Sequence, residues 1–168
     1  MPIDLPLRCK CGRLGGVALG VSPRAGCRVV CYCDDCQEGG RRIEALAKAG
    51  PVQDPDGGTA YLLYRKDRLE CVKGGPLLKG LKLKEKSATN RVVATCCNSA
   101  MVLNFDDGKP WVSVYRRRLA GNVPPPAMRI CTKFSKCPLP DDIPCYAGFP
   151  LRFAARIGAA WIPMLLGR

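Results

Sequence analysis

Seven of the twelve cysteines in this 168-residue chain stand in three short groups: a CxC pair, a CxCxxC triplet and a pair of adjacent cysteines. The groups are Cys9 and Cys11, then Cys31, Cys33 and Cys36, then Cys96 and Cys97. Zinc prefers such thiolate ligands, which it binds at about 2.3 Å in a tetrahedral arrangement. Two thiolates one or two residues apart on a tight turn can reach the same ion, so these groups are candidate metal ligands.

The spacing predicts two metal sites of different kinds. Three cysteines close together in the triplet supply the ligand count of a zinc site whose fourth position is open, where a substrate thiolate or a water can bind and be polarised. The CxC pair is followed by Gly12, which suits a tight turn on which both thiolates can reach one ion. We therefore expect about two zinc ions per chain. The alternative interpretation of the triplet is a thiol redox cluster.

The composition narrows the chemistry further. The chain contains no histidine, which excludes Ser-His-Asp and Cys-His nucleophiles and every histidine metal site. It is 47% apolar and 24% charged, as in an ordinary globular protein, and its length suffices for one compact domain with an appendage. Its first residues contain no apolar stretch typical of a secretion signal, so we expect a cytoplasmic protein whose clustered thiols bind metal rather than form disulfides.

Basic residues outnumber acidic ones, which gives a formal net charge of +13. Residues 116–168 contain nine Lys or Arg and two Asp, and therefore carry more than half of this excess. Such a surface favours anionic ligands and gives weak affinity for nucleic acid or an anionic surface, but it specifies none of them. The alternative for the Arg116–Arg118 run is an ordinary solvated edge or a set of ion pairs.

Short apolar segments separated by turn residues predict a mainly β fold with short antiparallel sheets. We expect strands near residues 17–21, 27–33, 60–64, 69–72, 77–83, 91–95, 101–105 and 111–115. One internal helix is predicted at 34–49, with Ile43, Leu46 and Ala47 on one face, and 51–58 is predicted to be a loop.

The composition changes after Tyr115, which predicts two parts. Residues 1–115 would form the metal-binding domain, and residues 116–168 a basic, Pro-rich C-terminal extension that ends in an apolar helix. The last 18 residues are interrupted by Arg152, Arg156 and Pro163, too short and broken for a transmembrane span. We expect a docked amphipathic helix; the alternative is an interfacial membrane helix that includes Trp161.

The segments CKCG, CYCDDCQ and CCNSAMVLNF, in this order, resemble the glutathione-dependent formaldehyde-activating enzyme family. The resemblance covers roughly residues 5–115. It implies a zinc-binding β-tent fold, a structural zinc held by Cys9, Cys11 and Cys97, and a catalytic zinc held by Cys31, Cys33 and Cys36. The implied reaction is that of a carbon-sulfur lyase, which makes or breaks the carbon-sulfur bond of S-hydroxymethylglutathione. A small thiol such as glutathione is then the expected partner.

The chain departs from the family pattern at several positions. Ala94 replaces the first cysteine of the third motif, so either Cys96 supplies the fourth ligand or the site has three protein ligands. Asn98 replaces a glycine and can adopt a positive φ angle at modest cost. Tyr32 and Gln37 replace a histidine and an arginine of the second motif. The alternative function is therefore a non-catalytic, zinc-stabilised module that binds nucleic acid, an anionic surface or a protein through its basic extension.

Five cysteines stand outside the three groups. They are Cys27, Cys71, Cys131, Cys137 and Cys145. We expect each of them to be a small, buried apolar residue without a chemical role.

Overall fold

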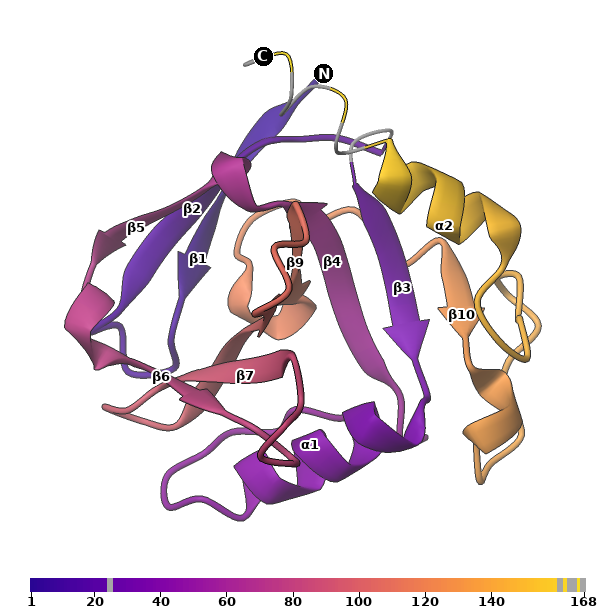
Figure 1. Cartoon of the computed structure of the whole chain (residues 1–168), viewed down its shortest axis with the longest axis horizontal. Coiled ribbons are helices and arrows are strands. Elements are labelled where there is room, and N and C mark those ends of the chain that lie inside the picture. The colour runs from indigo at the N-terminus through magenta and orange to yellow at the C-terminus, as the bar shows by residue number, and fades with distance from the viewer. Residues whose placement is uncertain (24–25, 160–161, 163–165, 167–168) are drawn as a thin grey trace.

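Two β-sheets and two helices make up the fold of the chain, as seen in a computed structural model that describes residues 1–23, 26–159, 162 and 166 (Figure 1). The small sheet has the order β1-β2-β5, formed by β1 (Ile3–Arg8), β2 (Gly15–Val21) and β5 (Leu69–Lys73). The large sheet has the order β10-β3-β4-β9-β8-β7-β6. The predicted mainly β fold is confirmed.

The large sheet is antiparallel except at one edge. Its strands are β3 (Cys27–Cys31), β4 (Thr59–Arg65), β6 (Leu78–Leu81), β7 (Thr89–Ala94), β8 (Ser99–Phe105), β9 (Trp111–Tyr115) and β10 (Met128–Ile130). At the edge, β10 pairs in parallel with β3, with Ile130 opposite Cys31. The sequence did not predict β1 or β10. Residues 116–168 thus contribute a strand to the same sheet as the first cysteine of the triplet.

Strand β4 separates two hydrophobic cores, because successive side chains of a strand point to opposite faces. Tyr61 and Leu63 belong to the core on the helix side of the large sheet. Leu62 and Tyr64 belong to the core between the two sheets. This explains why most of β4 is buried and why its sequence shows no alternation of apolar and polar residues.

Helix α1 (Asp34–Glu44) lies across one end of the large sheet (Figure 1). The prediction that this helix extends to residue 49 is wrong. Ile43 is its last buried side chain, and Leu46 and Ala47 are not part of a buried face. The Glu44 carboxylate instead accepts hydrogen bonds from the backbone N–H groups of the next loop. Without an apolar face to pack, nothing holds another helical turn against the core.

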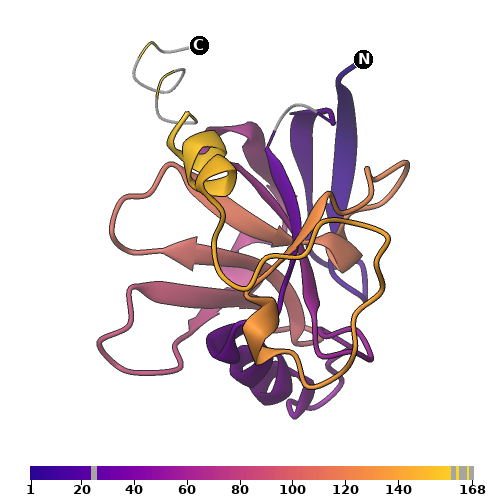
Figure 2. The ribbon, with the colours of Figure 1, turned by 90° about the vertical axis from the view of Figure 1, so that its right-hand side faces the viewer.

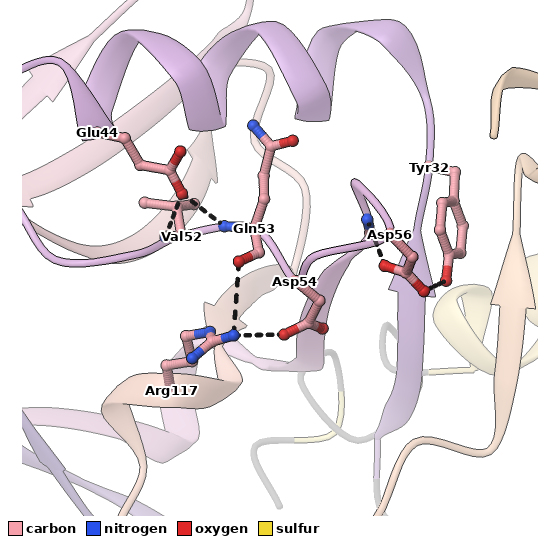
Figure 3. Close-up of polar contacts among 8 residues, drawn as sticks. Tyr32, Glu44, Val52, Gln53, Asp54, Asp56 and Arg117 are labelled. Atoms are coloured by element: carbon pink, nitrogen blue, oxygen red, sulfur yellow. Dashed lines mark hydrogen bonds and ion pairs between the residues drawn. The ribbon is translucent and has the colours of Figure 1, made fainter. Parts of the chain in front are cut away.

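The predicted loop at 51–58 is confirmed, and polar contacts fix its path (Figure 3). Glu44 accepts hydrogen bonds from the N–H groups of Val52 and Gln53, at 2.6 and 2.9 Å. Arg117 pairs with Asp54 in the middle of the loop. Near the end of the loop, Asp56 accepts a hydrogen bond of 2.7 Å from the Tyr32 hydroxyl. In the sequence, Tyr32 stands between the first two cysteines of the triplet.

Helix α2 (Leu151–Gly158) lies beside β3 and β10 (Figures 1 and 2). Phe153 and Ile157 are buried against the helix-side core, as expected for a docked amphipathic helix. The rest of the predicted helix, including Trp161 and Pro163, lies outside the described residues. In the described part of the chain, no helix is long and apolar enough to cross a membrane.

Candidate metal centres

The first cysteine group joins two hairpin turns that are far apart in the sequence. The turn between β1 and β2 carries Cys9 and Cys11, and the turn between β7 and β8 carries Cys96 and Cys97. All four sulfur atoms lie within 4.8 Å of one another. Sulfur atoms bound to one tetrahedral zinc ion are about 3.8 Å apart, as follows from the bond length of about 2.3 Å. The group could therefore hold a metal ion.

The individual distances place the Cys96 sulfur inside this group. It lies 3.8 Å from the sulfur of Cys9 and 3.3 Å from that of Cys11. The turn that makes this possible closes with a hydrogen bond of 3.1 Å from the Cys97 N–H to the Ala94 carbonyl. Asn98 follows with a φ angle of 50°, the conformation expected from the sequence. Cys96 is therefore placed to supply the fourth ligand, which the alanine at position 94 cannot provide.

Hydrogen bonds around this group favour ionised sulfur. The Leu14 N–H donates to the Cys9 sulfur at 3.3 Å, and the Ser99 hydroxyl lies 3.1 Å from the Cys97 sulfur. Burial raises the pKa of the Cys97 thiol, but the hydrogen bonds with Ser99 and the backbone outweigh it and lower this pKa to about 6. A thiol that ionises near neutral pH is ready to bind a metal.

The second group is the triplet, whose three sulfur atoms also lie within 4.8 Å of one another. Cys31 is the last residue of β3, Cys33 caps the N-terminus of α1, and Cys36 lies in the first turn of that helix. The backbone N–H groups of Cys36 and Gln37 both donate to the Cys33 carbonyl at 3.0 Å. The junction between strand and helix therefore gathers the three thiols.

The three thiols differ in their ionisation in the absence of metal. Hydrogen bonds from Cys31 and Cys36 lower the pKa of Cys33 to about 3. The hydrogen bond with Cys131 is the largest cause that raises the pKa of Cys31. The position of Cys33 at the helix N-terminus also favours a negative charge. Cys33 is thus the thiolate of the metal-free group.

A cavity of about 280 Å³ opens beside the triplet. Its walls are mostly apolar and include side chains of α2. Among the lining residues are Leu103, Phe105, Trp111, Ile130, Phe149 and Phe153. All three cysteines of the triplet also line this cavity. A small molecule in it would therefore contact both sulfur and apolar side chains.

Arg91 is the buried cation of this cavity, with 3% of its surface exposed. Its Nη2 donates a hydrogen bond of 2.6 Å to the Asp35 carbonyl, whereas its buried Nε has no partner. Among the described residues, no carboxylate forms an ion pair with Arg91. Its positive charge is one of the causes that lower the pKa of Cys33. Arg91 can therefore balance negative charge at the triplet.

A glycine in α1 makes room for this arginine. A Cβ atom at Gly39 would overlap the Nε of Arg91, so the arginine side chain would have to move. Glycine weakens a helix by its low propensity, and the close approach of Arg91 explains why glycine stands at position 39 of α1. Nothing in the sequence around Arg91 marks it as part of the site.

Comparisons with known proteins do not assign this chain to a family. No protein-family model matches the chain, and no curated protein matches it. A crystal structure of a Rhodobacter sphaeroides protein matches the chain with a TM-score of 0.49 and 16% sequence identity. The match covers 71% of this chain and 91% of that chain.

The cysteines outside the groups divide into two sets. Cys27 is buried in the core, as expected. Cys71, Cys137 and Cys145 are exposed, so their predicted burial is wrong. They lie on an exposed strand or in loops, where no core is available to cover them.

Cys131 is buried as predicted, but it is not isolated, because its thiol is the largest cause that raises the pKa of Cys31. This contact is not predictable from the local sequence. The only signal was the short apolar segment that ends at Cys131, and nothing in its spacing links it to the triplet.

Proposed function

We propose that the chain is a zinc protein with one structural and one reactive site, and that the reactive site acts on an adduct between a small thiol and an aldehyde. The observation that carries the proposal is the triplet of mutually close thiols at the wall of a cavity. The resemblance to the formaldehyde-activating enzymes supports glutathione and formaldehyde as the thiol and the aldehyde. The activity would be that of a carbon-sulfur lyase.

The donor atoms of the triplet fit zinc, because soft thiolates without competing carboxylates select such a cation. Zinc held there would lower the pKa of a thiol that joins it. In the forward direction the thiolate sulfur adds to the carbonyl carbon of formaldehyde. The carbon-sulfur bond forms, and the former carbonyl oxygen takes up a proton. The reverse step breaks this bond and releases the thiol and formaldehyde.

The side chains around the triplet have separate parts in this proposal. The Arg91 guanidinium balances the charge of three thiolates and attracts an anionic ligand. The Tyr61 hydroxyl donates to the Cys36 sulfur at 3.7 Å and orients it. The aromatic walls of the cavity exclude water from the reacting thiolate.

Magnetisation-exchange NMR tests the reaction directly, because it measures how fast formaldehyde and glutathione interconvert with their adduct. The zinc-loaded protein should accelerate this exchange, and Cys33→Ser should abolish the acceleration. Cys71→Ser is the matched control, because Cys71 is exposed and lies outside both groups. An exchange rate equal to that of the uncatalysed mixture, in protein with two zinc ions per chain, would refute the lyase and retain the metal sites.

A second function is favoured by one observation, the buried thiol of Cys131 that interacts with Cys31. If the chain's own thiols fill the second site and no external thiol displaces them, the protein is a non-catalytic zinc-stabilised module. Binding of nucleic acid or another polyanion through the basic extension is then the expected role. Arg117 and Arg129 already pair with Asp54 and Asp142, which leaves fewer free cations there than the sequence suggests.

A further inference from the structure

Cys131 approaches the triplet from a different part of the chain. Strand β10 runs parallel to β3, and the Tyr32 N–H donates to the Ile130 carbonyl at 3.1 Å. This register places the residue after Ile130 beside the residue after Cys31. The thiols of Cys31 and Cys131 are both buried, and the Cys131 thiol is the largest cause that raises the pKa of Cys31.

The backbone around Cys131 is fixed by contacts on both sides. The Cys131 N–H donates to the Gly148 carbonyl at 3.3 Å, and the Thr132 N–H donates to the Tyr146 carbonyl at 3.0 Å. From α1, the Gln37 side chain donates to the carbonyls of Phe134 and Tyr32 at 3.0 and 2.6 Å. Gln37 thus ties the turn that follows Cys131 to the start of the triplet. The thiol–thiol contact is held by the fold rather than by a mobile loop end.

The conformation of Cys131 is unusual for a residue with a side chain. Its φ angle is 57°, in the left-handed region that glycine and asparagine adopt most easily. A cysteine in this region costs about 1 kcal/mol or more, which the surrounding contacts must offset. Glycine would fit there without strain, so what the cysteine adds is its thiol.

We propose that Cys131 is the fourth sulfur ligand of the metal ion held by Cys31, Cys33 and Cys36. This inference rests on the metal site, but not on the lyase reaction, of the proposed function. A tetrahedral ion needs one ligand beyond the three sulfurs of the triplet. The Cys131 sulfur contacts that of Cys31 but is not among the sulfurs that lie within 4.8 Å of all the others. To bind the ion, its side chain must turn toward Cys33 and Cys36.

The fourth position can then be reached from two directions. The cavity is lined by the three cysteines of the triplet, and Cys131 is not among its lining residues. An external thiol would therefore enter from the cavity, whereas Cys131 approaches from the side of β10. An external thiol must displace Cys131 to bind the ion. The chain's own thiol thus protects the ion when no external thiol is present and sets the affinity for one that arrives.

NMR of the protein loaded with cadmium-113 tests this assignment, because each site gives its own resonance and a four-sulfur site resonates downfield of a three-sulfur site. The wild-type protein should give two resonances, both in the four-sulfur range. Cys131→Ser should shift one resonance upfield and leave the other unchanged. Cys137→Ser, an exposed cysteine in the same segment, should shift neither.

Two further measurements keep the test decisive. Asn adopts the left-handed conformation easily, so Cys131→Asn removes the sulfur without strain if the serine variant fails to fold. Glutathione added to either variant should return the shifted resonance to the four-sulfur range. A wild-type resonance in the three-sulfur range that Cys131→Ser does not move would overturn the role of Cys131 and leave the open site of the proposed function intact. A single bound ion per chain, or a Cys31–Cys131 disulfide in protein kept with reductant, would also overturn it.

Discussion

At the scale of single residues, the same side-chain type has different chemistry in different places. Cys27 is buried among apolar side chains, and burial raises the pKa of its thiol. Cys33 lies at the start of a helix among other thiols, and its pKa is lowered to about 3. Spacing along the sequence distinguishes Cys33 from Cys27, because Cys33 belongs to the CxCxxC pattern, which lies at a strand-to-helix turn. It does not reveal which thiol carries the charge.

Cys33 should therefore react first when the metal-free protein is alkylated. Because its pKa is lowered to about 3, it is a thiolate over the whole range between about pH 5 and 8. Its alkylation rate should be nearly flat over this range, as mass spectrometry of peptides can follow. The rate for free cysteine in the same buffer should rise with pH, because the pKa of a free cysteine thiol is about 8.5. A Cys33 rate that rises as steeply as that of free cysteine would contradict the assignment, and bound metal should protect Cys33.

At the scale of elements, most of the fold follows from local patterns and the rest from long-range pairing. Strands such as β4 and β9 are predicted because their apolar residues are consecutive and bounded by turn residues. Strand β10 has three residues, and it forms because β3 offers a free edge in parallel register. The seven grouped cysteines were predictable because each motif is local. Cys131 and Arg91 were not, since only the tertiary fold brings them to the triplet.

Packing between α1 and β7 gives a prediction at this scale, through Gly39. Alanine would favour the helix by about 1 kcal/mol, but its Cβ would collide with the Arg91 Nε at 1.9 Å. We expect Gly39→Ala to lower the free energy of unfolding by about 1–3 kcal/mol, measured by urea denaturation, because the arginine must leave its place. It should also weaken metal binding at the triplet, since the charge of Arg91 moves away.

Gly148→Ala is the matched control, because a Cβ there meets nothing within 4 Å. Its free energy of unfolding should stay within about 0.5 kcal/mol of the wild type. If Gly39→Ala were as stable as this control, the close contact with Arg91 would not constrain the helix.

At the scale of the whole molecule, the two cysteine groups connect different parts of the structure. The first group joins the small sheet to the large one, since its cysteines come from the β1–β2 and β7–β8 turns. The second joins β3 to α1 inside the large-sheet core. Metal removal should therefore have unequal effects at the two sites.

Cys9→Ser should unfold the protein, whereas Cys33→Ser should lose one ion and keep the fold. Structural zinc contributes about 10–16 kcal/mol in small zinc domains, which is comparable with the whole stability of a domain, about 5–15 kcal/mol. Thermal melts followed by circular dichroism, with elemental analysis of the metal, measure both effects. Equal melting temperatures for Cys9→Ser and the wild type would refute the structural role of the first group.

The predicted division of the chain after Tyr115 can be tested by two truncations. Removal of residues 149–168 takes away α2 and its buried Phe153 and Ile157, each worth about 1.5–3 kcal/mol, but leaves every strand in place. This shorter chain should keep both cysteine groups and Cys131, with a lower melting temperature and the same metal content.

Removal of residues 116–168 takes away β10 as well and exposes the edge of β3, which is an aggregation hazard. It also removes Cys131, the proposed fourth ligand. We expect this chain to aggregate or to melt far below the first truncation, and to bind its second ion more weakly. If it instead folds as a stable monomer with wild-type affinity for two ions, residues 1–115 are an independent domain, and neither its fold nor its metal binding requires β10. The parallel pairing of β10 with β3 favours the first outcome, because a chain that completes the sheet beside a metal ligand is part of the unit that binds the metal.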